Sequence, residues 1–139
     1  MKSRNTGVMN RREALAAMAV SAVAACTSDR PTDPDGNGDE VVAMTNQLTF
    51  SPATLNISVG DTVTFRNTSS GGIIHTATCD PAKATNPANV SLPAGAAVWD
   101  SGSVAPGGQF NHTFTVAGQY RYLCRPHELQ AMLGTINVS

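Results

Sequence analysis

Three side chains near the carboxyl end of the sequence could together hold a metal ion. Cys124, His127 and Met132 place a thiol, an imidazole and a thioether within nine residues. Soft sulfur ligands combined with imidazole favour copper, whereas harder ions prefer carboxylate and carbonyl oxygens. The types and spacing of these residues therefore predict a copper site.

A second imidazole would complete a recognised copper geometry. One cysteine and two histidines in a trigonal arrangement, with a weak and distant methionine, form the blue-copper sites that transfer single electrons. The sequence contains two other histidines, His75 and His112. His112 alternates with two phenylalanines in an expected strand, which indicates a packed or rim position. His75 is therefore the better candidate.

The first 25 residues are typical of an export signal. Four basic residues precede an apolar segment at 14–25, whose 12 residues are too few to span a bilayer. Residues 10–15 resemble a twin-arginine motif, and the general secretory route is the alternative. Residues 23–26 resemble a bacterial lipobox, which predicts a lipid on Cys26 and a membrane-anchored protein in the periplasm or on the cell surface. An ordinary signal peptide, with Cys26 incidental, is the other interpretation.

The segment 26–40 has the composition of a flexible acidic tether. Residues 27–40 include two prolines, two glycines and five acidic residues and almost no apolar side chain. Such a segment cannot bury enough surface to offset the entropy lost on ordering. The remaining residues, 41–139, fit one small domain with four basic and four acidic residues. They carry no basic stripe, so nucleic acid is not an expected partner.

The domain has the pattern of an all-β protein. Short apolar or alternating segments are separated by frequent turn residues, which favours an antiparallel β-sandwich of about eight strands. A long segment at 80–96, rich in proline, asparagine and alanine, is expected to be a loop. The expected strands are 41–44, 48–50, 55–59, 62–66, 73–78, 98–101, 110–116, 120–124 and 133–138.

Several motifs together resemble the cupredoxins, and most closely their plastocyanin-like branch. The resemblance extends from about residue 49 to residue 139. Its most specific part is the spacing Cys-x-Pro-His-x4-Met-x-Gly at 124–134. The other parts are the segment 59–63 leading to Asn67, His75 after a glycine-rich turn, the segment 104–108, and the segment 118–124.

The resemblance implies a Greek-key sandwich that binds one copper ion, cycling between Cu2+ and Cu+. It makes His75, Cys124, His127 and Met132 the ligands. We also expect Asn67 to hold the ligand loops through its side-chain amide. Pro126 has no amide hydrogen, so the backbone N–H of Thr76 is the expected donor to the Cys124 sulfur.

The sequence departs from many plastocyanins at three positions. Thr76 and Arg125 replace an asparagine and a serine that bond to each other, which leaves the lock between the ligand segments unassigned. Leu123 replaces a tyrosine that serves as a remote electron port, and no acidic run surrounds it. We therefore expect redox proteins to dock at the edge of His127, through a mostly apolar surface. That surface is expected to include Pro52, Gly71, Gly72, Leu129 and Ala131.

The other cysteine and the large aromatic side chains are expected to be structural. Cys79 shares strand parity with Ile73, His75 and Ala77, and a free cysteine packs as a small hydrophobe. A second metal role or an intermolecular disulfide is the alternative. Trp99, Tyr120 and Tyr122 are expected in the core.

The leading interpretation is an exported electron carrier and not an enzyme. The main alternative is a periplasmic copper carrier or chaperone, a role that favours methionine clusters. Beyond residue 26 the sequence has Met44 and Met132 alone. Three histidines are too few for the added copper cluster of a multicopper oxidase or nitrite reductase. A zinc site built from the same residues is a further alternative.

Overall fold

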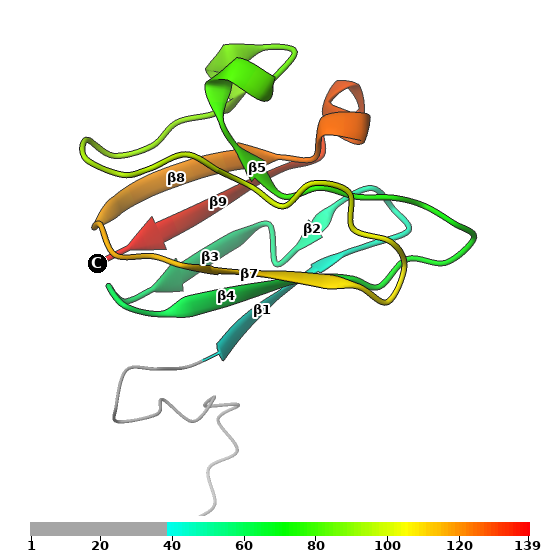
Figure 1. Cartoon of the computed structure of the whole chain (residues 1–139), viewed down its shortest axis with the longest axis horizontal. Helices are drawn as coiled ribbons and strands as arrows, with labels where there is room; N and C mark the ends of the chain where they lie inside the picture. The colour runs from blue at the N-terminus through cyan, green and yellow to red at the C-terminus, as the bar shows by residue number, and fades with distance from the viewer. Residues whose placement is uncertain (1–38) are drawn as a thin grey trace, which may run out of the picture. The chain divides into compact units, whose positions relative to one another are not determined.

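Nine strands in two stacked sheets form the part of the protein that the structure, a computed structural model, describes, residues 39–139 (Figure 1). One sheet has the order β2-β1-β4-β7 and the other the order β3-β9-β8-β5-β6. The strands are β1 Asp39–Met44, β2 Phe50–Ser51, β3 Thr54–Ile57, β4 Thr62–Asn67, β5 Thr78–Cys79, β6 Trp99–Asp100, β7 Gln109–Thr113, β8 Gly118–Leu123 and β9 Leu133–Val138.

The predicted all-β sandwich is confirmed, and its sheets are mixed rather than purely antiparallel. β1 pairs in parallel with β4, and β3 pairs in parallel with β9. The chain crosses between the sheets after β2, so strands that are close in sequence are not always neighbours in a sheet. Alternation of apolar residues identifies the buried face of a strand, but it does not identify the strand's partner.

Most expected strands differ from the structure by a few residues at their ends, and two differences matter for the domain and the site. β1 begins at Asp39, two residues before the expected start of the domain. The expected strand at 73–78 is reduced to β5, because before Thr78 the chain is tied to its neighbour through one bridge between His75 and Val104. The predicted signal peptide, the lipidation site Cys26 and most of the predicted tether lie outside the described residues.

The loop expected at 80–96 contains two short 3-10 turns, η1 Pro81–Lys83 and η2 Pro87–Asn89. Each turn begins with a proline and is capped by the preceding side chain, Asp80 or Asn86, which accepts a backbone N–H bond. Among the described residues, no helix has the length and apolar character needed to cross a bilayer.

The core between the sheets is aromatic. Trp99, Tyr120 and Tyr122 are buried, as predicted, and Phe65 contacts both Trp99 and Tyr122. Tyr122 lies against its register partner Gly134, where a Cβ atom would come within 2.3 Å of the tyrosine ring. Any larger residue at 134 would displace the Tyr122 ring from its place over β8 and β9, the two strands on either side of the loop that carries Cys124 and His127.

Candidate metal centre

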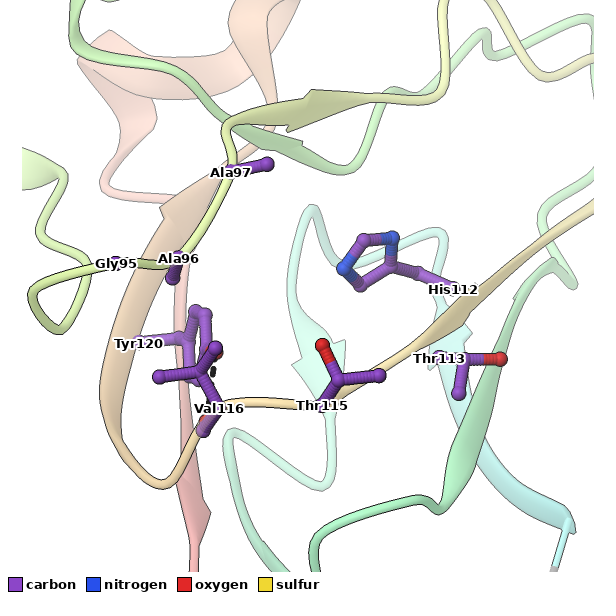
Figure 2. Close-up of a pocket in the computed structure, with 8 residues that line it drawn as sticks. All are labelled: Gly95, Ala96, Ala97, His112, Thr113, Thr115, Val116 and Tyr120. Carbon is purple, nitrogen blue, oxygen red and sulfur yellow. Dashed lines mark hydrogen bonds between the residues drawn. The ribbon is translucent and has the colours of Figure 1, made fainter.

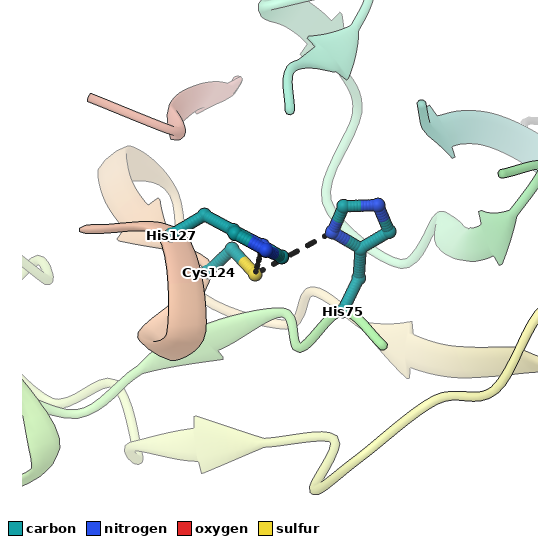
Figure 3. A group of neighbouring side chains, drawn as sticks. All are labelled: His75, Cys124 and His127. Carbon is teal, nitrogen blue, oxygen red and sulfur yellow. Dashed lines mark hydrogen bonds between the residues drawn. The ribbon is translucent and has the colours of Figure 1, made fainter. Parts of the chain in front are cut away.

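Three side chains from two distant segments converge at one end of the sandwich. The ligand atoms of His75, Cys124 and His127 all lie within 4.8 Å of one another. The Cys124 Sγ is 3.6 Å from His75 Nδ1 and 3.4 Å from His127 Nδ1, and both imidazoles face the sulfur (Figure 3). His75 and Cys124 are fully buried, whereas His127 is partly exposed.

The loop between β8 and β9 places the other residues of the predicted ligand set. Cys124 follows the last residue of β8, and His127 lies in the 3-10 segment η3, Arg125–Gln130. The Cys124 N–H donates to the Met132 carbonyl at 3.1 Å, and the Met132 N–H donates to the His127 carbonyl at 3.2 Å. Met132 is fully buried on this closed loop, directly before β9.

Asn67, at the end of β4, joins the segments around His75. Its side-chain amide donates to the carbonyls of Ile73 at 2.9 Å and Val104 at 2.7 Å. The backbone of His75 exchanges two hydrogen bonds with the same Val104. Asn67 is buried and uses both its amide hydrogens and its carbonyl oxygen, which also accepts from Ser69. The backbone at His75 is therefore fixed from two sides.

The hydrogen bond of the His75 ring leaves one nitrogen free for a metal. Nε2 lies 3.1 Å from the carbonyl oxygen of Thr45. A carbonyl can only accept, so Nε2 carries the hydrogen and Nδ1, which faces Cys124, carries the lone pair. Burial, followed by the neighbouring His127, lowers the pKa of His75, and this favours the neutral ring that a metal requires.

The Cys124 sulfur accepts a hydrogen bond from the Thr76 backbone N–H at 3.3 Å. Burial raises the pKa of the Cys124 thiol, and the Thr76 N–H offsets part of that effect. In the metal-free protein the thiol therefore tends to keep its proton, which a metal would displace. One sulfur and two imidazole nitrogens suit copper or zinc and do not suit calcium or magnesium.

The two ligand segments are locked together despite the departures at positions 76 and 125. The Thr76 hydroxyl oxygen accepts the backbone N–H of Arg125 at 2.9 Å. The residue after His75 thus bonds directly to the residue after Cys124. The hydroxyl provides this bond because it needs only the Arg125 backbone, so the identity of the Arg125 side chain is not critical.

Glu128 is a site residue that sequence reasoning missed. Its buried carboxylate accepts from the backbone N–H groups of Thr85 at 2.7 Å and Asn86 at 2.8 Å, and from the side chain of Asn89 at 3.0 Å. Although burial alone would raise it, these hydrogen bonds hold the pKa of Glu128 below its usual value. The partners lie about forty residues upstream, so no local pattern could have revealed the contact.

His112 and Cys79 lie apart from this cluster. His112 stacks on Trp99, with ring centroids 4.9 Å apart, and lines a small cavity of about 160 Å³ beside Ala97 and Thr115 (Figure 2). Cys79 is a fully buried free thiol, as expected, and its Sγ donates to the carbonyl of Arg121 at 3.3 Å.

Comparisons with known proteins agree with this geometry. Residues 38–139 match the family described as copper binding proteins, plastocyanin/azurin family. A chloroplastic plastocyanin from Tetradesmus obliquus is 36% identical over 96 residues, which cover 69% of this chain and 62% of the relative. The chain therefore spans less than two thirds of that relative's length.

Solved structures have the same fold. A pseudoazurin from Sinorhizobium is 27% identical with a TM-score of 0.56, and the match covers 73% of each chain. A copper-containing nitrite reductase from Thermus scotoductus is 26% identical with a TM-score of 0.56, but only 22% of that enzyme's chain is covered. The likeness to the enzyme is therefore limited to a small part of it.

Proposed function

We propose that this protein, which belongs to the plastocyanin/azurin family of copper-binding proteins, carries single electrons between redox partners outside the cytoplasm. The observation that carries the proposal is the cluster of His75, Cys124 and His127, whose donor atoms lie within 4.8 Å of one another. A copper ion bound there would supply the one-electron couple between its cupric and cuprous states.

The proposed ligands are His75, Cys124, His127 and Met132, with the methionine as the weak axial ligand. Hydrogen bonds through Asn67 and Thr76 fix the backbone next to His75 and next to Cys124. A rigid ligand set lets the electron move with little rearrangement of the surrounding atoms, and a buried site excludes water as a competing ligand.

His127 is the proposed route for the electron because it is the partly exposed member of the cluster. Leu129, on the same loop, is 83% exposed, which is unusual for a large apolar side chain. Pro52, Gly71, Gly72 and Ala131, the other residues expected at the docking surface, are also exposed. Docking through such a surface would make electron exchange only weakly dependent on salt, and a steep fall in rate with added salt would contradict it.

We also propose that the protein is exported and anchored through a lipid on Cys26, with the part of the expected tether that precedes β1, residues 26–38, letting the domain reach its partners. The basic and apolar leader and the lipobox-like residues before Cys26 support this part of the proposal. Cys26→Ser would then release the protein from the membrane fraction. Unchanged membrane association of that variant would exclude the anchor.

The copper-carrier and enzyme alternatives are disfavoured because the chain has too few methionines and histidines to form the sites that they require. A copper carrier would need several methionines, yet Met44 is packed in the core beside β4, and Met132 belongs to the ligand loop. An enzyme with a second copper centre would need more histidines, and the third one, His112, is stacked on Trp99. We therefore propose a carrier with no catalytic activity of its own.

An optical spectrum of the oxidised, copper-loaded protein tests the proposal. A thiolate bound to cupric ion gives an intense visible charge-transfer band, so the protein should be strongly blue or green. Chemical reduction should remove the colour and reoxidation should restore it. A colourless protein that retains zinc, or rapid loss of copper to a modest chelator, would favour the zinc-site or copper-carrier alternative.

A further inference from the structure

A chain of hydroxyl groups connects the ligand segments to a charged residue in another strand. Thr76 and Thr78 are buried, and their hydroxyl oxygens lie 3.0 Å apart. The Thr78 oxygen also lies 2.7 Å from Oδ1 of Asp100, its register partner in β6. At the other end of the chain, the Thr76 oxygen accepts the backbone N–H of Arg125, next to Cys124.

Thr78 is the donor in this chain. The Asp100 carboxylate can only accept, so the Thr78 hydroxyl donates to it. The same hydroxyl also donates to the Thr76 oxygen, which accepts from Thr78 and from the Arg125 N–H. The carboxylate thus fixes the direction of the Thr78 hydroxyl, and Thr78 in turn holds the Thr76 oxygen beside the Arg125 backbone.

The surroundings of Asp100 keep it ionised. Oδ1 also accepts the Gly102 N–H at 3.2 Å, and Oδ2 pairs with Lys83 at 2.7 Å and with the Arg125 side chain at 3.9 Å. Although burial acts in the opposite direction, these contacts and the Thr78 hydroxyl hold the pKa of Asp100 below its ordinary value.

We propose that Asp100 is a positioning residue for the metal centre, acting through Thr78 and Thr76. Thr76 is the junction because its oxygen holds the Arg125 backbone and its own N–H bonds to the Cys124 sulfur. Loss of the oriented hydroxyls would loosen both contacts. The part of the inference that concerns copper rests on the proposed ligand set, whereas the effect on the Arg125 backbone does not.

The first test uses the metal-free protein and measures amide hydrogen exchange at Arg125. In Thr78→Val the Thr76 oxygen loses the Thr78 hydroxyl as a donor, while both ion pairs of Asp100 stay. We expect the Arg125 amide to exchange about tenfold faster, the scale of one lost buried hydrogen bond. Thr78→Ser should restore the wild-type rate. Thr62→Val is the matched control, because Thr62 forms a hydroxyl pair with Thr113 at 2.7 Å on the other sheet.

The second test measures the reduction potential of the copper-loaded protein. A hydrogen bond to the sulfur stabilises the reduced state more, because the sulfur then donates less of its charge to the metal. Thr78→Val should therefore lower the potential, and Thr78→Ser should leave it unchanged. Lys83→Gln removes an ion pair without touching the hydroxyls, and it should change neither the potential nor the exchange rate.

The two tests separate this inference from the proposed function. If the Arg125 amide exchanges as expected but the protein never develops the visible copper band, the proposed function would be overturned, while the role of the hydroxyl chain in holding Arg125 would be supported. Wild-type exchange at Arg125 in Thr78→Val, or an equal acceleration in Lys83→Gln, would overturn the chain. If Thr78→Val does not fold, Asp100→Leu, which leaves no acceptor at position 100, is tested on the same amide, and an unchanged rate there would overturn the chain as well.

Discussion

The two buried cysteines of the domain have similar burial and opposite surroundings. Cys79 and Cys124 are both fully buried, and burial raises the pKa of both thiols. Around Cys124 lie two imidazole nitrogens and the backbone N–H of Thr76. Around Cys79 lie the carbonyl oxygens of Arg121 at 3.3 Å and Ser91 at 3.6 Å.

This difference shows that the partners of a thiol, rather than its depth, decide its role. A carbonyl oxygen accepts the S–H hydrogen and repels a thiolate, so Cys79 is held in its protonated form. An N–H donor and the lone pair of an oriented imidazole favour a thiolate shared with a metal ion. The comparison therefore supports the proposed metal binding by Cys124 and a packing role for Cys79, and the following experiments test these two proposals.

The largest expected effect is the loss of the copper chromophore. Cys124→Ser removes the thiolate, so we expect complete loss of the intense visible band in the copper-loaded protein. Cys79→Ser is the matched control and should keep the band, because the Cys79 sulfur makes its hydrogen bonds to backbone carbonyls and lies outside the histidine cluster. Retention of the band in Cys124→Ser, or its loss in Cys79→Ser, would reverse the assignment.

The second experiment measures how stability changes at alkaline pH. Burial and Asp80 raise the pKa of Cys79 from 9.0 to about 12. A raised folded-state pKa stabilises the protein fully below pH 9, and that stabilisation is lost as the pH rises toward 12. The full difference corresponds to about 4 kcal/mol, since one unit of pKa is about 1.4 kcal/mol.

Cys79→Ala is the variant for this measurement. The wild-type protein should lose stability relative to the variant between pH 9 and 11 in denaturant unfolding, although the variant begins less stable because of its cavity. Burial, followed by Cys79, also raises the pKa values of Tyr120 and Tyr122. Both proteins share the effect of burial, so the difference between them reports Cys79 together with its influence on the two tyrosines. If the stabilities of the two proteins changed in parallel with pH, the pKa of Cys79 would not be raised in the folded protein, and its surroundings would not hold it in the protonated form.

The third experiment tests the hydrogen bonds that Glu128, on the same loop as Cys124, accepts from the segment containing Thr85 and Asn86. In Glu128→Gln an amide NH2 group faces the backbone donors of Thr85 and Asn86, so at least one loses its acceptor. We expect a loss of about 1–3 kcal/mol in the free energy of unfolding. Amide exchange should accelerate at Thr85 and Asn86 and stay unchanged at Cys79, within β5.

Asp39→Asn is the matched control, since it makes the same carboxylate-to-amide change at an exposed position. Its stability should stay within about 0.5 kcal/mol of wild type. If both variants lost the same free energy of unfolding, the negative charge of Glu128, and not its hydrogen bonds to Thr85 and Asn86, would stabilise the loop.

Much of the fold and the cluster could be predicted because the informative residues are local. The spacing from Cys124 to Met132 lies on one loop, and the alternation at 110–114 marks His112 as a packed residue. Turn residues and short apolar segments were enough to predict a sandwich.

The features that could not be predicted depend on contacts between distant segments. Glu128 reads as a surface residue until the loop with Thr85 is folded over it, and Asp100 reads as a strand-end charge until β5 pairs with β6. The parallel pairing of β1 with β4 is equally hidden, because one strand's pattern does not identify its neighbour. Positioning residues are therefore harder to predict from sequence than ligands, whose residue types are specific.

The smallest expected effect concerns His112, the histidine that lies outside the proposed metal site and near Cys79. His112 stacks on Trp99, the register partner of Cys79, and burial lowers the pKa of its ring. His112→Phe should keep the copper band and, at pH 7, change stability by about 0.5 kcal/mol or less. A lowered folded-state pKa makes wild-type stability fall as the pH drops below the ordinary value of 6.5, because the unfolded chain then binds the proton more readily. The variant should therefore become the more stable protein by pH 5 in denaturant unfolding, and identical acid profiles, or a weakened copper band, would place His112 in a different role.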